Sequence, residues 1–231
     1  MKSHGFLHRS LYALAGLIAV GICAAAVALL WMDRRASWTQ AYVSASNLTE
    51  VLAADIGRTI HVYDLSLQGV IERLQEPGIR DLPRATLHRF LFDRSASAEF
   101  LGTILILDSE GNVVYDSQTI EPPKANFADR DFFQVHRDSA DAGMYVSRPY
   151  RSRLRDGDES IGISRRLSNL DGSFAGVVTG SLRLAFFRER FARLSLGPQD
   201  SITILRNDGA VIARSPLSLI HISEPTRLGM I

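Results

Sequence analysis

The sequence is constrained most by an uninterrupted apolar run near its N-terminus. Residues Leu11 to Met32 include no charged side chain, and Arg9 and Asp33-Arg34-Arg35 bound them. At about 1.5 Å per residue, a helix of these 22 residues covers the roughly 30 Å hydrocarbon core of a bilayer. The run predicts a transmembrane helix over 11–32, preceded by a cytoplasmic N-terminus of residues 1–10.

A cleaved signal sequence is the alternative for this segment. Met1 to Arg9 would form its basic beginning, and Ala24-Ala25-Ala26 would form its cleavage site. The apolar run continues to Trp31, however, and exceeds the ~7–15 residues typical of a signal sequence. We therefore favour an uncleaved anchor, with the following domain outside the cytoplasm.

A helical pattern continues beyond the charged break. Glu76-Pro77-Gly78 ends it with residues that stop helices. We expect a stalk helix over 33–78 whose apolar stripe packs partly on its own domain and partly on a second copy, in a parallel homodimer. The residues of the stripe recur at intervals of three or four: Trp38, Tyr42, Ala45, Leu48, Leu52, Ile56, Ile60, Tyr63, Leu67, Val70 and Leu74.

After the stalk the pattern becomes one of mixed short elements, which predicts an α+β fold with an antiparallel sheet. Residues 103–117 align without gaps on 201–215 with six identities, including the turn glycines Gly111 and Gly209. This repeat predicts that a second module of the same kind begins near residue 197. We expect helices over 82–94, 126–140 and 185–194, a hairpin over 103–116, and strands over 143–150, 159–167 and 174–184.

Composition and motifs exclude several functions. The net charge is +1, from 26 basic and 25 acidic residues, whereas nucleic-acid binding needs a basic surplus on one face. The six histidines lack metal-ligand spacing, and no nucleophile elbow or phosphate-cradling loop is present. We expect no catalytic residue, metal or cofactor in this chain, and no nucleic-acid partner.

A series of motifs resembles a known family. The series is Ala128-Asp-Arg-Asp-Phe-Phe133, Tyr145-Val-Ser-Arg-Pro-Tyr150, Ile163-Ser-Arg-Arg-Leu167 and Asp171-Gly-Ser-Phe-Ala-Gly-Val-Val178, after the span, stalk and first hairpin. It resembles the double-Cache (PDC, PAS-like) extracytoplasmic sensors of bacterial diguanylate cyclases and histidine kinases.

The resemblance implies a membrane-distal sensor module over 79–196 and a membrane-proximal module of which only 197–216 is present. It also implies a ligand-sensing region on the periplasmic or extracellular side of a bacterial inner membrane. The alternative is a ligand-free dimerisation or scaffold module. Leu217 to Ile231 resembles translated sequencing-adapter DNA, so we expect an artefactual tail on a truncated chain.

The resemblance also implies a ligand site in the distal module. Arg130 begins the Arg-x-aromatic-aromatic motif that binds a ligand carboxylate in amino-acid-sensing relatives, through charge-assisted hydrogen bonds. Ser181 stands where an amine-binding aspartate would fall, and a hydroxyl cannot neutralise an ammonium. A small carboxylate or another anion therefore fits better than an α-amino acid. The expected site residues are Arg130, Phe133, Tyr145, Ser147, Tyr150 and Ser181.

Two simpler interpretations stay open for the arginines. Arg130 could pair with Asp129 or Asp131 and cap a structural helix. The arginines that follow alternate with acidic residues, which is typical of a solvated surface, although a role in steering anions is the alternative. They are Arg148, Arg151, Arg153, Arg155, Arg165 and Arg166.

The orientation of the anchor is testable by proteolysis. Because residues 36–216 follow the apolar run and are expected outside the cytoplasm, protease added to spheroplasts should digest them. Lysed cells provide the control for cleavage. Full protection in spheroplasts with digestion after lysis would reverse the orientation.

Overall fold

The computed structural model describes residues 4–92, 101–155, 157–194, 197 and 200–216, and the side chains of these except 4–15, 80 and 101. The C-terminal tail predicted over 217–231 lies outside the described residues. The chain divides into two compact units, Met1–Arg58 and Thr59–Ile231.

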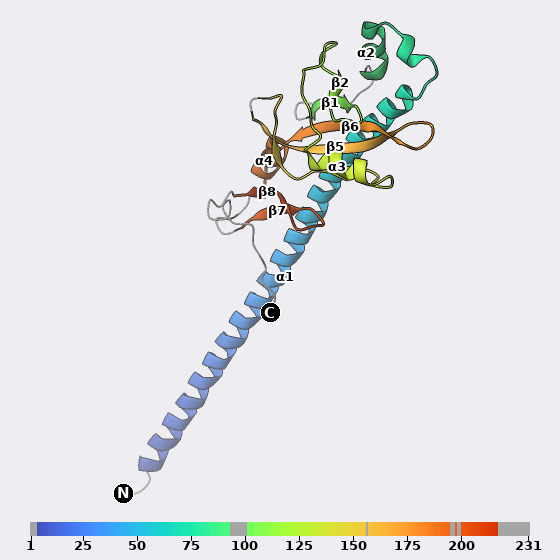
Figure 1. Ribbon diagram of the computed structural model, residues 1–231. Helices are drawn as coiled ribbons and strands as arrows, with labels where there is room; N and C mark the ends of the chain where they lie inside the picture. The colour runs from blue at the N-terminus through green and yellow to red at the C-terminus, as the bar shows by residue number, and fades with distance from the viewer. Residues whose placement is uncertain (1–3, 93–100, 156, 195–196, 198–199, 217–231) are drawn as a thin grey trace. The chain divides into compact units, whose positions relative to one another are not determined.

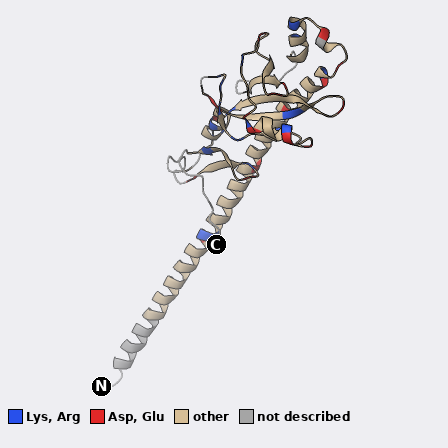
Figure 2. Ribbon diagram, in the orientation of Figure 1, with Lys and Arg blue, Asp and Glu red and all other residues tan. Residues whose placement is uncertain are grey.

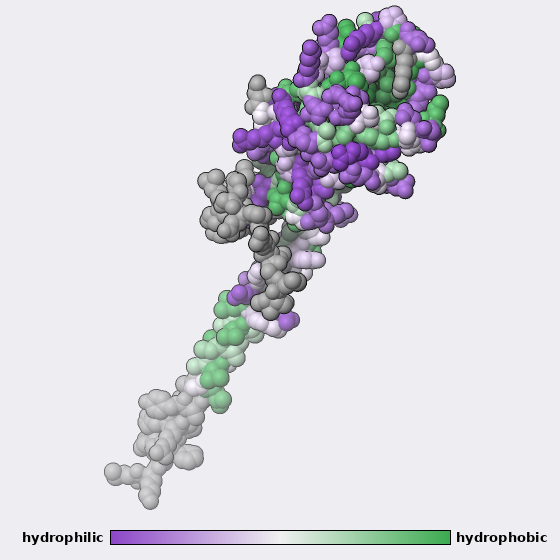
Figure 3. Space-filling view, viewed as in Figure 1, coloured by the Kyte–Doolittle hydropathy of each residue, from purple (hydrophilic) through white to green (hydrophobic). Residues whose placement is uncertain are grey.

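One helix, α1 (His4–Leu74), begins in the first unit and ends in the second. It passes through the charged residues 33–35 without a break, so the predicted span and stalk are parts of one helix. Its most apolar window has a mean hydropathy of 2.1 and is not buried, and the helix is long and apolar enough to cross a membrane. Figure 2 shows this long stretch of α1 without charged residues, and Figure 3 shows its apolar surface.

The second unit contains an antiparallel six-stranded sheet of order β2-β1-β6-β5-β3, in which β4 also pairs with β5 (Figure 1). This confirms the predicted α+β fold. The expected strand over 143–150 is instead two short strands, because Pro149 has no N–H for a continuous ladder. The strands are β1 (Leu101–Leu107), β2 (Val113–Asp116), β3 (Tyr145–Val146), β4 (Tyr150–Arg151), β5 (Glu159–Ser168) and β6 (Phe174–Arg183).

Helices connect and cover the strands. The helix expected over 126–140 is shorter, because the Asn126 side chain binds the Glu110 carbonyl and the Phe127 N–H binds the Gly111 carbonyl. These contacts hold the chain in a turn until Arg130. The helical elements are the 3-10 turn η1 (Ile79–Asp81), α2 (Arg84–Phe92), α3 (Asp131–Asp138) and α4 (Ala185–Ala192).

The internal repeat forms two hairpins with the same turn. In the first, β1 and β2 are joined through Gly111 at φ 86°; in the second, β7 (Ile202–Leu205) and β8 (Val211–Ser215) are joined through Gly209 at φ 81°. Both glycines occupy the left-handed region, which other residues adopt at a cost. The repeated sequence therefore encodes a repeated turn.

The two faces of the sheet are covered by different helices. Strand alternation sends Ile104 and Ile106 to one face, where they join Tyr63, Leu67 and Val70 of α1 in one core cluster. Each such fully buried side chain contributes roughly 1.5–3 kcal/mol to folding. The C-terminal part of α1 is thus an integral layer of the second unit.

The opposite face has a second core. Leu105 and Leu107 of β1 pack there with Phe132 and Phe133 of α3. These side chains come from the alternate positions of the same strand. The sheet therefore separates the layer of α1 from the layer of α3.

Tyr63 attaches α1 to the backbone of the sheet. Its buried hydroxyl donates to the carbonyl oxygen of Gly102 at 2.9 Å and to that of Ser181 at 3.3 Å. The pairing of β1 with β6 shifts register between Leu101 and Ile104, so this bond lies at a bulge. A Cβ on Gly180 would lie 2.4 Å from the phenol, so the close approach requires glycine there.

Asp64 provides a second attachment on the next residue of α1. Its Oδ1 accepts from Arg165 Nε at 2.5 Å, and its Oδ2 accepts from Arg165 Nη2 at 2.8 Å and from Gln68 Nε2 at 2.9 Å. Asp64 is only 5% exposed. The neighbours of Arg165 in the sequence predicted that it belongs to a solvated surface cluster. Arg165 instead binds α1 to β5.

Removal of the Tyr63 hydroxyl should destabilise the second unit. In Tyr63→Phe the Gly102 carbonyl loses a buried donor, and we expect the free energy of unfolding to fall by about 1–2 kcal/mol. Urea unfolding followed by circular dichroism measures the change. The matched control is Tyr42→Phe, because Tyr42 is 76% exposed and its hydroxyl should contribute nothing comparable. Equal stability of the two variants would contradict the assigned role.

Candidate functional site

A small cavity lies between the sheet and the segments that cover its α3 face. It has about 20 Å³ available to the centre of a water-sized sphere, which is room for about one ordered water. Strands β1 and β6 supply one side of its lining, and α3 and the turn after β4 supply much of the rest. The lining residues are Thr103, Leu105, Phe127, Phe132, Tyr150, Ser152, Leu154, Arg155, Thr179 and Ser181.

The lining combines hydroxyl groups with one cation. Five of its residues carry a hydroxyl, Arg155 carries a guanidinium, and no carboxylate belongs to the lining among the described residues. Asp116 lies behind Thr103, whose hydroxyl donates to it, and Asp116 also accepts from the Gln118 N–H at 2.8 Å. The cavity surface thus offers hydrogen-bond donors and positive charge.

Arg155 lies at the end of the cavity where β1 and β6 meet. Its Nη1 is 3.0 Å from the position a Cβ would take on Gly102, and the Ser181 hydroxyl is adjacent to the same point. Within the part of the chain that the structure describes, its guanidinium forms no hydrogen bond or ion pair. It is a cation beside a cavity without a counter-ion.

Arg130 lies next to the cavity, against the ring of Tyr150. It is the residue that precedes α3, its Cζ is 4.9 Å from the Tyr150 ring centre, and its Nη2 donates to the Arg151 carbonyl at 3.1 Å. Its Nε is buried and has no hydrogen-bond partner. Burial raises the pKa of Tyr150 to about 12, while Arg130 and Arg155 both act to lower it.

The acidic neighbours of Arg130 are engaged elsewhere. Arg153 binds both carboxylate oxygens of Asp129, at 2.8 and 2.6 Å. Asp131 accepts from the Tyr145 hydroxyl at 3.2 Å and from the Arg148 N–H at 2.8 Å. Neither aspartate forms an ion pair with Arg130 in the described structure, which differs from the simpler interpretation left open above.

The structure brings together only part of the predicted site. Tyr150 and Ser181 line the cavity, and Arg130 lies against Tyr150. Phe133 is buried in the core and packs edge-on against Phe174, with ring centres 5.5 Å apart. Phe132, its neighbour in the motif, lines the cavity instead.

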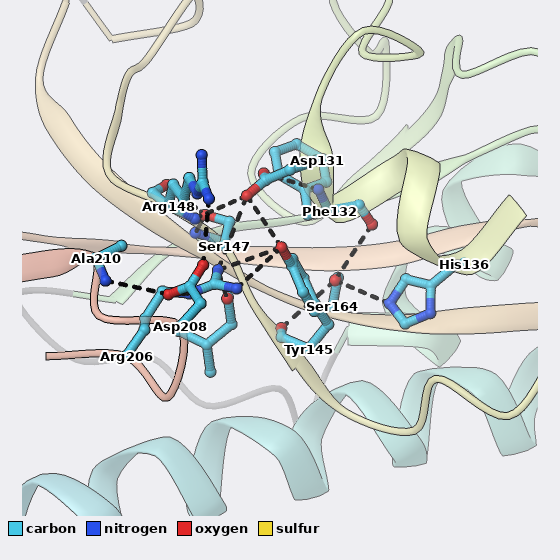
Figure 4. Close-up of polar contacts among 12 residues, drawn as sticks. Asp131, Phe132, His136, Tyr145, Ser147, Arg148, Ser164, Arg206, Asp208 and Ala210 are labelled. Atoms are coloured by element: carbon cyan, nitrogen blue, oxygen red, sulfur yellow. Dashed lines mark hydrogen bonds and ion pairs between the residues drawn. The ribbon is translucent and has the colours of Figure 1, made fainter. Parts of the chain in front are cut away.

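Two other predicted residues do not line the cavity. The Ser147 hydroxyl is buried, accepts from the Gly162 N–H at 2.7 Å and donates to the Arg148 carbonyl at 2.8 Å. Tyr145 points into the polar network of Figure 4. Conversely, sequence reasoning missed Arg155, because it lies in a run of alternating charges that resembles a solvated surface.

The polar network of Figure 4 connects α3 and β3 with the second hairpin. Arg206, which directly follows β7, donates to the Tyr145 hydroxyl at 3.2 Å and to the Val146 carbonyl. Its side chain is only 15% exposed, and its Nη1 is 3.9 Å from Asp131. Asp208 in the same turn accepts from Arg206 at 3.2 Å and pairs with Arg148 at 3.3 Å. The repeat hairpin is therefore bound to α3 and β3 by charged side chains.

His136 of α3 is a buried neutral base. Its Nε2 lies 3.0 Å from the Ser164 hydroxyl, and its Nδ1 is buried without a partner (Figure 4). Burial lowers its pKa to about 4, and the positive charges of Arg166 and Arg165 act in the same direction. No group of three or more potential metal ligands occurs among the described residues.

The depressed pKa of His136 predicts a dependence of stability on pH. The unfolded chain binds more protons than the native chain between the ordinary pKa of 6.5 and the native value of about 4. Stability should therefore be full above pH 6.5 and fall by about 3 kcal/mol as the pH drops toward 4. Melting curves across this range test it. In His136→Gln the fall between these pH values should shrink, and an unchanged fall would contradict it.

Comparisons with known proteins place this fold among sensor domains. No protein-family model and no curated protein matches the chain. Among solved structures, the extracellular domain of rpHK1S-Z16, a protein assigned as a histidine kinase, is 27% identical; the match covers 74% of this chain and 72% of that one, with a TM-score of 0.53.

Two further structures share the fold at lower identity. An extracellular ligand-binding receptor from Desulfohalobium retbaense is 16% identical, with 71% of this chain and 29% of that one covered and a TM-score of 0.53. The ligand-binding domain of the Pseudomonas fluorescens chemoreceptor CtaA, in complex with L-isoleucine, is 16% identical, with 71% and 62% covered and a TM-score of 0.51. The chain thus spans less than two thirds of each of these two structures. Its fold is that of the extracellular ligand-binding domains of histidine kinases and chemoreceptors.

Proposed function

We propose that this chain is the extracytoplasmic sensor region of a bacterial signal-transduction protein of double-Cache architecture, and that its cavity binds a small organic anion such as a carboxylate. The parent protein would be a histidine kinase or a diguanylate cyclase in the inner membrane. The observation that carries the ligand class is a pair of guanidinium groups, Arg155 in the cavity lining and Arg130 behind the ring of Tyr150. Neither forms an ion pair with a described carboxylate.

Electrostatics supports an anionic ligand. A charge near a site of low dielectric is stabilised when an opposite charge completes its hydrogen bonds. Arg130 has a buried Nε without a partner, and Arg155 lines the cavity directly. Ser181 supplies a hydroxyl where an ammonium would need a carboxylate. The site therefore suits a carboxylate and disfavours an amine.

A ligand larger than a water molecule requires the cavity to open. The wall formed by Tyr150, Ser152 and Arg155 is suited to this movement, because β4 pairs with β5 through only two residue pairs. The ring of Tyr150 separates Arg130 from the cavity. We propose that this wall moves outward on binding and that the long Arg130 side chain then reaches the ligand.

The stalk supports signalling through a second copy. Trp38 and Tyr42 are large apolar side chains exposed on one face of α1 in the first unit. We propose that they pack in a parallel homodimer, in which two anchors share one membrane. The relatives in solved structures are ligand-binding rather than catalytic domains, so the reaction of the parent protein would belong to another domain.

The second candidate is a ligand-free scaffold module. The small volume of the cavity favours it, because about 20 Å³ holds no organic ligand in the closed form. Ligand binding to the native state raises the melting temperature, whereas a scaffold does not respond. A thermal-shift screen with acetate, lactate and succinate separates the two. Absence of any shift at millimolar concentrations would favour the scaffold.

Arg130 should contribute strongly to affinity if the sensor function is correct. In Arg130→Gln a charge-assisted hydrogen bond worth about 1.5–3 kcal/mol is lost, so we expect the affinity for the carboxylate with the largest thermal shift to fall roughly 10- to 150-fold. Calorimetry measures this.

Arg137→Gln is the matched control for Arg130→Gln. Arg137 lies on α3, the helix that Arg130 precedes, is exposed and pairs with Asp138 at 2.8 Å. Its replacement removes the same charge and should leave affinity within about twofold, since an exposed pair contributes little. Equal affinities of Arg130→Gln and wild type, with the fold preserved, would remove Arg130 from the site.

A further inference from the structure

We infer that Arg155 is a second anion anchor and that the ligand carries two acidic groups, as a small dicarboxylate does. This inference rests on the proposed function, because it assigns the ligand class of the same cavity. The sequence pattern predicted that Arg155 belongs to a surface cluster. In the structure Arg155 lines the cavity.

The two guanidinium groups approach the cavity from different elements. Arg155 follows β4 and lies beside Gly102 and Ser181, where β1 and β6 meet. Arg130 precedes α3 and lies against the ring of Tyr150. A single carboxylate neutralises one guanidinium through a two-pronged hydrogen bond and leaves the other charge unmatched. Two carboxylates on one short ligand match both.

The carboxylates around the site do not supply this missing charge. Asp129 is bound by Arg153 at 2.6 Å, and Asp158 lies 3.7 Å from Arg183. Asp131 is held by the network of Tyr145 and Arg148.

Asp116 is an acid directly behind the lining. It accepts from the Thr103 hydroxyl and the Gln118 N–H, so Thr103 lies between it and the cavity. Among the described residues, the charges of Arg130 and Arg155 therefore exceed that of the shielded Asp116 carboxylate, which leaves the cavity positive. A ligand with two negative charges is therefore favoured over one with a single charge.

The rest of the lining determines what accompanies the two acidic groups. Ser152 and Ser181 offer hydroxyls, whereas Phe127 and Phe132 offer apolar surface. The Thr179 hydroxyl donates to the Ile163 carbonyl at 3.3 Å instead. Hydroxyls donate to carboxylate oxygens, and the apolar surface suits a short carbon chain between them. No described lining residue offers the carboxylate that an ammonium requires. The lining thus selects a dicarboxylate over its amino derivative.

The test compares three ligands of four carbons by calorimetry on the full chain in detergent. Succinate has two carboxylates, butyrate has one, and L-aspartate has two carboxylates and an ammonium. In the wild type we expect succinate to bind at least about tenfold more tightly than butyrate, as one additional charge-assisted bond predicts, and more tightly than L-aspartate.

Substitution then assigns the second carboxylate to Arg155. Arg155→Gln should weaken succinate roughly 10- to 150-fold and leave butyrate within about threefold, so the ratio between the two ligands collapses. Arg155→Lys should retain part of the succinate affinity, because it keeps the charge but not the two-pronged geometry. Arg151→Gln, four residues away with an exposed side chain, removes the same net charge and should preserve the ratio.

The outcomes separate the two hypotheses. If butyrate binds as tightly as succinate and Arg155→Gln leaves both unchanged, the cavity binds one acidic group and this inference alone is overturned. If none of the three ligands binds the wild type at millimolar concentrations, both the proposed binding of small organic anions and the inference of a dicarboxylate ligand are overturned. The Arg155 guanidinium forms no hydrogen bond or ion pair with described residues, so the melting temperature of Arg155→Gln without ligand should match the wild type.

Discussion

The hydrogen bond from Tyr63 to the Gly102 carbonyl is the interaction on which the rest of the structure depends. It joins α1 to the sheet backbone at the point where β1 and β6 shift register. Leu67 and Val70, which follow Tyr63 along α1, continue the same helix face into the core. Because the phenol approaches Gly180 so closely, sheet and helix cannot separate locally without exposing both an apolar ring and a buried polar group.

This attachment explains why the cavity is close to α1 although a sheet lies between them. Ser181 directs its side chain to the cavity lining and its carbonyl to Tyr63. Thr103, the neighbour of Gly102, also lines the cavity. A shift of either strand at the cavity therefore changes the hydrogen bonds of Tyr63. The lining residues Ser181 and Thr103 are thus no more than one residue from the carbonyls that bind Tyr63. Tyr63 belongs to α1, the helix that continues toward the anchor.

Much of the fold could be predicted from local sequence, because its signals are local. An uncharged run, a stripe of period 3.6 and a glycine at a left-handed turn each act within a few residues, and they located α1 and both hairpins. The start of α3 was placed too early. Asn126 and Phe127 are held by Glu110 and Gly111, and such contacts between distant segments leave no trace in periodicity.

The candidate site could be predicted only in part, for the same reason. Tyr150 and Ser181 line the cavity, whereas Phe133 lies in the core and Phe132 lines the cavity in its place. Two adjacent aromatic residues at the start of a helix point about 100° apart, and sequence alone does not show which of them meets the sheet. Arg155 resembled its solvated neighbours, since the sequence does not show which charge in a run lacks a partner.

The junction before α3 shows how adjacent residues of opposite charge serve different parts of the molecule. Arg130 is extended, at φ −81° and ψ 143°, whereas Asp131 is the first helical residue. This change of conformation separates their side chains, so Arg130 lies over Tyr150 while Asp131 binds Tyr145 and lies near Arg206. If the two were paired with each other, the cavity would lose a cation and the second hairpin would lose a contact. The start of one helix therefore keeps the cavity positive and binds the repeat hairpin at the same time.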